Sequence, residues 1–167
     1  LTDSVRLDFA DTEAIKNAVM TYGSVTMQYN AASQKVTYAS DAIGTTGRKY
    51  RIFGSALPNM VNSSHSVAIV GWDDNFDRSY FSVNREMIEA NVKSVCKTMP
   101  SFWEKFRKWW GVGSAEELFS LTDDEFQAKF RPAMNGAWLV KNSWNVAGDT
   151  EYNGYAWISY EDVMVNR

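Results

Sequence analysis

The residues of this chain that could carry out chemistry are His65 and Asn142. His65 is the only histidine among 167 residues, and it stands just before the apolar run at 67–72. An imidazole can accept and return a proton near neutral pH. The side-chain oxygen of Asn142 can accept the Nδ1 proton of a histidine, which we expect to leave Nε2 facing a nucleophile. The pair therefore predicts the base and the orienting group of a nucleophilic site.

The alternative role for His65 is structural, because a single histidine at the entrance of a strand is a weak catalytic signal. Its pairing with the run Lys141-Asn142-Ser143-Trp144 favours the catalytic role. Trp144 lies two positions after Asn142, on the same face of an extended strand. We expect its indole to cover the hydrogen bond between His65 and Asn142 and to exclude water from it.

The nucleophile of such a site is not evident in the sequence. Cys96 is the only cysteine, and its neighbours Lys93 and Lys97 would favour a thiolate. A free cysteine is nevertheless more often simply packed, so we predict that Cys96 is a buried or incidental thiol. With one cysteine and one histidine, a disulfide framework and a zinc cluster are both excluded.

A second candidate site is the acidic run at 73–77, in which Asp73, Asn75 and Asp77 have the opening spacing of an EF-hand loop. Arg78 stands where that loop needs glycine, and Asn84 stands where it needs glutamate. We therefore predict an acidic turn here. No metal or other cofactor is expected for this chain.

The elements that must position these residues can be read from apolar spacing. A helix is expected from Asp11 to Gly23, followed by a strand at 25–29, and further strands are expected at 67–72, 137–143 and 155–160. The glycine-containing stretch at 40–62 is expected to be a long surface connection. This order predicts an α+β domain over 1–167, built on an antiparallel sheet or partial barrel with an N-terminal helix.

The segment at about 80–135 departs from this pattern and is expected to be a helical insertion. It holds three pairs with the spacing of a capping box: Ser101 with Glu104, Ser114 with Glu117, and Thr122 with Glu125. It also holds an aromatic stripe at helical spacing, formed by Phe102, Trp103, Phe106, Trp109 and Trp110. We expect the stripe to pack within its own domain, the alternative being that it covers a cleft or docks on another domain.

Four segments, in the same order, resemble the papain family of cysteine peptidases. They are the helix and strand at 12–28, the histidine strand that follows His65, the asparagine strand at 138–144, and the run Asn153-Gly154-Tyr155-Ala156-Trp157-Ile158. The resemblance implies the right-hand domain of that fold, with His65 and Asn142 catalytic and Trp144 supporting. It also implies that Thr26, Gln28, Ser63, Ser64 and Ser66 line a substrate pocket.

The chain also departs from the family pattern. Asn145 replaces a glycine after the tryptophan, Ser64 stands before the histidine where plant enzymes have aspartate, and the helical insertion separates the two site strands. Bacterial members vary at these places, so the resemblance implies a bacterial protein. The cysteine and the oxyanion glutamine of the family are missing, and the resemblance places both in a left-hand domain of the same parent protein.

The composition of the chain argues against two classes of partner, nucleic acids and the membrane interior. A net charge of -3 and a pI near 5.2 argue against a nucleic-acid partner. No apolar run reaches the roughly 20 residues of a membrane span, and any export signal is expected before Leu1. The family resemblance implies a secreted or cell-surface location.

Two functions follow from the sequence. The first is a papain-like endopeptidase acting on peptides or proteins, in which this chain supplies the base and is inactive alone. The second is a non-catalytic peptide- or protein-binding module, or an inactive homologue of the peptidases. A cysteine opening a helix in the parent protein would favour the first, and serine or glycine at that place would favour the second.

Overall fold

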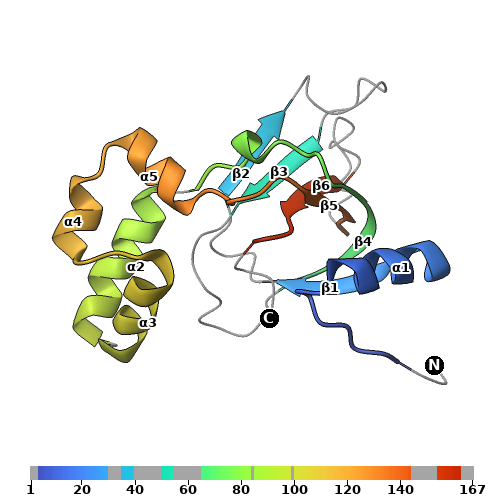
Figure 1. Ribbon diagram of the computed structural model, residues 1–167, viewed down its shortest axis with the longest axis horizontal. Coiled ribbons are helices and arrows are strands. Elements are labelled where there is room, and N and C mark those ends of the chain that lie inside the picture. The colour runs from blue at the N-terminus through green and yellow to red at the C-terminus, as the bar shows by residue number, and fades with distance from the viewer. Residues whose placement is uncertain are drawn as a thin grey trace.

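The computed structural model describes residues 4–29, 35–39, 50–54, 65–83, 85–98, 100–143 and 154–162. Its elements, shown in Figure 1, are α1 (Thr12–Tyr22), β1 (Val25–Tyr29), β2 (Lys35–Ala39), β3 (Tyr50–Gly54), β4 (His65–Asp73), the 3-10 helix η2 (Arg78–Tyr80), α2 (Arg85–Thr98), α3 (Pro100–Trp110), α4 (Ala115–Ser120), α5 (Asp123–Phe130), β5 (Ala137–Lys141) and β6 (Tyr155–Ser159). The α+β class predicted from the sequence is confirmed.

One sheet joins the described strands in the order β1-β4-β5-β6-β3-β2, with β1 and β2 at its edges. Neighbouring strands run antiparallel apart from β3 and β6, which are parallel. The expectation that 40–62 is only a surface connection is wrong at 50–54, because these residues form β3. The parallel pairing with β6 holds them in the sheet. The rest of that stretch lies outside the described residues.

Helix α1 has the limits that the sequence predicts. The Asp11 carboxylate accepts a hydrogen bond from the Ala14 N–H at 2.9 Å, which caps the first turn. Gly23 ends the helix in the left-handed conformation, with φ +84°. The helix buries Ile15 and Val19 against one face of the sheet. On that face the strands bury a continuous core formed by Met27, Val67, Ile69, Trp138, Val140, Ala156 and Ile158.

The other face of the sheet is covered near β5 and β6 by the segment that follows β4. Phe76 and Phe81 are buried there with Ala137 and Trp157. The Phe76 and Trp157 rings lie 4.8 Å apart between centroids. Parts of β5 and β6 are thus buried on both faces of the sheet.

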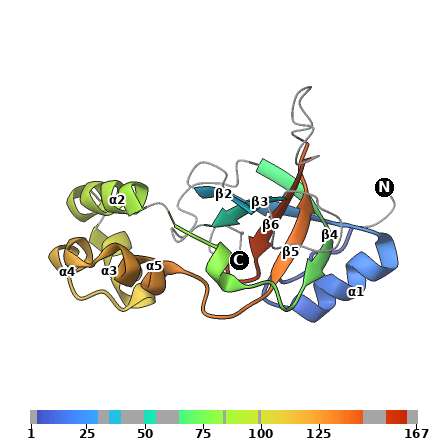
Figure 2. The same cartoon turned by 90° about the horizontal axis from the view of Figure 1, so that it is seen from above.

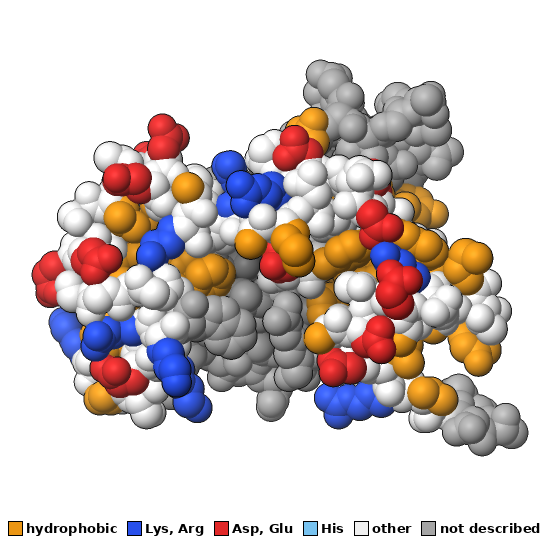
Figure 3. Space-filling view, viewed as in Figure 1, with side chains coloured by type: hydrophobic (Ala, Val, Ile, Leu, Met, Phe, Trp, Pro, Cys, Tyr) orange, Lys and Arg blue, Asp and Glu red, His pale blue; other side chains and the backbone are white. Residues whose placement is uncertain are grey.

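Helices α2 to α5 form a separate cluster at the side of the sheet away from α1 (Figures 1 and 2). The cluster has a hydrophobic core of its own, consisting of Val83, Ile88, Val92, Phe106, Val112, Leu118, Phe126 and Phe130. Charged side chains of both signs alternate over the face of the cluster seen in Figure 3. This arrangement explains how a long helical segment fits between two adjacent strands of one sheet.

The capping signals of the helical cluster differ in outcome. Thr122 and Glu125 form a reciprocal capping box at α5. Ser114 caps α4, but the Glu117 carboxylate accepts from the Gly113 N–H instead of reaching back to Ser114. The predicted helix start at Ser101 is wrong, because α3 already includes Pro100.

The aromatic stripe of α3 packs within the helical cluster at its described side chains. Phe106 is fully buried, and Trp103 and Trp110 pack against the same core. This is the packing that the sequence favours over covering a cleft. Across the described parts of the chain, none of the helices combines the length and the apolar character needed to cross a bilayer.

Candidate active site

Strand register brings His65 and Asn142 to the same face of the sheet. Ile69 of β4 and Val140 of β5 are direct register partners, and both are buried in the core beneath α1. Side chains alternate along a strand, so His65 lies on the face of Ile69 and Asn142 on the face of Val140. Residues 77 positions apart are therefore placed together at one end of two adjacent strands.

The two side chains are joined by a hydrogen bond between His65 Nε2 and Asn142 Oδ1, at 2.8 Å. Asn142 is buried, with 4% of its surface exposed, and His65 is partly buried. Oδ1 can only accept, so Nε2 must carry the proton in this contact. The arrangement can hold the imidazole in one tautomer and one orientation.

The ring nitrogen in this contact differs from the one expected. The sequence predicts that Nδ1 of His65 contacts Asn142, and the structure has Nε2 there instead. The reason is geometric: His65 opens β4 and reaches across to the neighbouring strand, so the nitrogen farther from its own backbone meets the amide. In a neutral ring with a proton on Nε2, Nδ1 is the basic nitrogen.

Asn142 lies one residue beyond the end of β5, where its backbone is held by β6. The N–H of Asn142 donates to the carbonyl oxygen of Gly154 at 2.7 Å. This bond continues the pairing of Lys141 with Tyr155 by one step. The side chain that contacts His65 thus projects from backbone that is paired with a central strand.

The residues expected to contact substrate are partly within the described chain. Gln28 is the register partner of Ser66, and Thr26 is the partner of Ala68, so all four lie on one face of the β1–β4 pair, opposite to the face of His65 and Ile69. Thr26, Gln28 and Ser66 are exposed there. Ser63, Ser64 and Trp144 lie outside the described residues.

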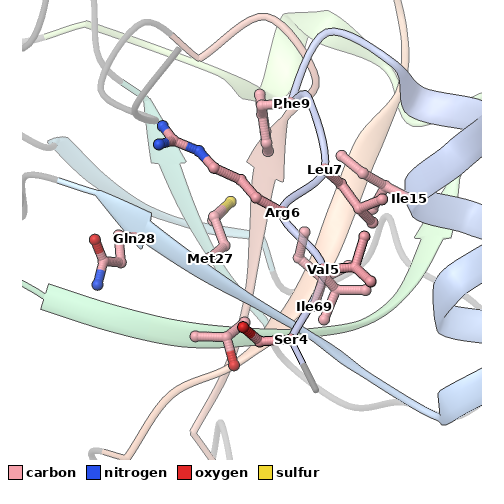
Figure 4. Close-up of a pocket in the computed structure, with 11 residues that line it drawn as sticks. Ser4, Val5, Arg6, Leu7, Phe9, Ile15, Met27, Gln28 and Ile69 are labelled. Carbon is pink, nitrogen blue, oxygen red and sulfur yellow. The ribbon is translucent and has the colours of Figure 1, made fainter.

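A pocket of about 470 Å³ opens beside the edge strand β1 (Figure 4). Thr26 and Gln28 line it, together with the segment that precedes α1, including Arg6. Apolar side chains of that segment, α1 and the strands complete the lining: Val5, Leu7, Phe9, Ile15, Val25, Met27 and Ile69. His65 and Asn142 are not among the lining residues. The sequence carried no signal for residues 4–9, because their place beside β1 depends on tertiary packing.

Cys96 is in a setting that disfavours a thiolate. Burial within the helical cluster raises the pKa of its thiol, and the nearby Glu116 carboxylate raises it further. The neighbouring lysines do not reverse this effect. The prediction that Cys96 is a packed thiol agrees with its contacts.

The acidic run after β4 forms a turn. The Asp73 carboxylate accepts from the Asn75 N–H at 2.8 Å, and the Asp77 carboxylate accepts from the Ser79 N–H at 2.7 Å. These bonds satisfy backbone donors within the turn. Among the described residues, no three His, Cys, Asp or Glu side chains are grouped so that they could hold a metal ion.

A charged cluster that the sequence analysis missed ties α1 to the far end of the sheet. Lys16 Nζ lies 2.8 Å from the Glu13 carboxylate and 2.7 Å from the Asp74 carboxylate. The Tyr160 hydroxyl donates to Asp74 at 2.8 Å. Hydrogen bonds from Lys16 and Tyr160 lower the pKa of Asp74, and burial together with Asp74 raises the pKa of Tyr160. The only sequence signal was the i,i+3 spacing of Glu13 and Lys16.

Comparison with known proteins found no match among family models or curated proteins. The solved structures similar to this chain include two that each have 28% sequence identity and a TM-score of 0.49. One is a clostridial cysteine protease, Cwp84, after propeptide cleavage. The match covers 96% of this chain and 25% of that protein chain. The other comprises the cysteine protease and lectin-like domains of Cwp84, a surface layer associated protein of Clostridium difficile. This match covers 96% of this chain and 22% of that protein chain.

This chain spans about a quarter of the length of those proteins. A TM-score of 0.49 describes only partial superposition, so the chemistry of the site rests on His65 and Asn142 themselves. Both solved structures are of the cysteine protease Cwp84. Over 96% of its length, this chain is similar to a part of that protein.

Proposed function

We propose that this chain is the base-bearing domain of a papain-like cysteine peptidase from a bacterium, with residues at about 80–135 as a helical insertion. The observation that carries the proposal is the 2.8 Å hydrogen bond between His65 Nε2 and Asn142 Oδ1. A buried amide that accepts from one ring nitrogen sets the other nitrogen as the base.

The proposed reaction begins with a thiol supplied by a second domain of the same parent protein. His65 Nδ1 takes the thiol proton, and the thiolate attacks the carbonyl carbon of the scissile peptide bond. The imidazolium then gives this proton to the leaving amine, which departs as the C–N bond breaks. Water attacks the resulting thioester as His65 accepts one of its protons. The C–S bond then breaks, the imidazolium returns this proton to the leaving thiolate, and the carboxylic acid product is released and ionises in solvent.

Asn142 has a defined part in both half-reactions. Its Oδ1 accepts the Nε2 proton in the neutral ring and in the imidazolium, so the ring need not turn when it gains a charge. An amide suits a thiolate–imidazolium pair because it orients the ring without adding another negative charge. Trp144 would shield this bond from water.

Substrate contacts are proposed along β1 and at the start of β4. Thr26, Gln28 and Ser66 share an exposed face of these strands, and Ser63 and Ser64 precede His65 in the sequence. Small polar side chains at 63, 64 and 66 would leave room for the side chain of a peptide or protein substrate. The proposed location is the cell surface or the exterior of the cell.

The proposal is tested by labelling the parent protein, with both domains present, with a thiol-directed epoxide inhibitor of cysteine peptidases. We expect stoichiometric labelling and peptide hydrolysis in the parent, and loss of both in the His65→Ala variant. The isolated chain, containing only Cys96, should remain unlabelled.

An unlabelled parent, under conditions in which papain is labelled, would contradict the proposal. Retained binding of peptides in that protein would instead support the non-catalytic binding module.

A further inference from the structure

We infer that Gly154 is a positioning residue, whose backbone sets Asn142 at hydrogen-bond distance from His65. The importance of this contact for catalysis rests on the function proposed above. The contact itself is a property of this chain and can be measured without any activity.

The first observation is the position of Asn142 relative to the sheet. The pairing of β5 with β6 ends at Lys141 and Tyr155. Beyond that pair, the Asn142 N–H donates to the Gly154 carbonyl at 2.7 Å. The backbone of the orienting residue is thus fixed by the glycine that enters β6.

The second observation is that the site requires glycine for two separate reasons. Gly154 has φ +72°, a left-handed conformation that residues with a side chain rarely adopt. A Cβ at this position would also lie 3.0 Å from the Asn142 carbonyl oxygen and 3.0 Å from Lys141 Nζ. The lysine end can move aside, whereas the carbonyl can give way only if the backbone of Asn142 moves.

A small movement of Asn142 is enough to affect the site. The bond from His65 Nε2 to Asn142 Oδ1 is 2.8 Å long, and such bonds extend to about 3.2 Å. If Asn142 moved a few tenths of an ångström away from His65, the distance between the two atoms would come close to this limit. A side chain at 154 should therefore weaken the hold on the imidazole while the sheet remains paired.

The test uses the single histidine of the chain, which gives one set of imidazole signals in ¹⁵N NMR. In the unmodified chain at a pH where the ring is neutral, Nε2 should carry the proton and Nδ1 should not. We expect Gly154→Ala and Gly154→Asn to move the two nitrogen signals toward each other, as the tautomers mix. Asparagine is included because it tolerates positive φ better than alanine, which protects the test against simple misfolding.

Gly23→Ala is the matched control. Gly23 has a similar φ of +84°, but a Cβ there would have no neighbour within 4 Å. This variant adds the backbone strain without the contact, so its histidine signals should not change. Unchanged signals in both Gly154 variants would overturn the inference. Unfolding of both, with Gly23→Ala folded, would also overturn it, because the glycine would then serve the whole fold.

Kinetics in the parent protein separate this inference from the proposed function. We expect Gly154→Ala to lower kcat about 3- to 10-fold with KM unchanged, which is the effect of weakening one hydrogen bond. Shifted histidine signals without any peptidase activity in the parent would support the positioning role and contradict the proposed function. An active parent in which Gly154→Ala leaves kcat unchanged would contradict the positioning role alone.

Discussion

Removing the Asp74 carboxylate should destabilise the domain by more than its exposed position suggests. The Asp74 side chain is 55% exposed, but it accepts from both Lys16 at 2.7 Å and Tyr160 at 2.8 Å. Lys16 is only 13% exposed and lies over the rings of Trp72 and Tyr160. The carboxylate therefore joins α1, the end of β4 and the end of β6.

The expected loss for Asp74→Ala is about 2 kcal/mol. A hydrogen bond from a hydroxyl to a charged group contributes roughly 1.5–3 kcal/mol, and the exposure of Asp74 favours the lower end. The half-exposed ion pair with Lys16 adds about 0.5 kcal/mol. Lys16 keeps Glu13 as a partner, so no further cost of an unpaired buried charge is added.

The assay is urea unfolding of this chain followed by tryptophan fluorescence, with Glu13→Ala as the control. Glu13 pairs with the same lysine, but its side chain is 75% exposed, so its loss should cost only about 0.3 kcal/mol. Equal losses for the Asp74 and Glu13 variants would refute the reasoning. They would show that the contact with Tyr160 adds nothing to the stability of the domain.

Three further predictions concern groups outside the candidate site. The pKa of Asp74 is lowered in the folded chain, so the stabilisation by its carboxylate is present above the unfolded pKa of about 3.9 and is lost as the pH falls through the folded pKa. Between pH 6 and pH 2, the free energy of unfolding should therefore fall more steeply in the unmodified chain than in Asp74→Asn. Because the pKa of the Cys96 thiol is raised, iodoacetamide at pH 7 should modify it more slowly in the folded chain than in urea. Equal rates in the two conditions would contradict this prediction. The Gln127 side chain accepts from the Val83 N–H and donates to the Val83 carbonyl oxygen, both at 2.9 Å. Gln127→Leu should lower the free energy of unfolding, measured by thermal unfolding, by about 2 kcal/mol, and Gln127→Glu, which keeps the acceptor, should lower it less.

The parts of the fold that were predictable are those set by local pattern. Apolar spacing and Gly23 defined α1, and the alternation around Met27 defined β1. Strand β3 could not be predicted, because its place in the sheet comes from pairing with β6, about a hundred residues later in the sequence. Pairing of that kind leaves little trace in the local sequence.

The candidate site was predictable in its residue types but not in its geometry. The motifs around His65 and Asn142 indicated that the two side chains meet. Which ring nitrogen faces the amide depends on how far the imidazole must reach between strands, and the nitrogen predicted from the sequence, Nδ1, is the wrong one. The contact of Gly154 with Asn142 was also not predictable, because it depends on a positive φ at the entrance to β6.

The most direct test of the proposed role of His65 is the pH dependence of thiol alkylation in the parent protein. Cys96→Ala would first remove the thiol that this chain itself contributes. If His65 takes the proton of the incoming thiol, alkylation should stay rapid to at least one pH unit below the ordinary thiol pKa of about 8.5. The His65→Ala variant should return the midpoint to about 8.5, with Asn142→Ala in between. The same alkylation profile with and without His65 would contradict the account.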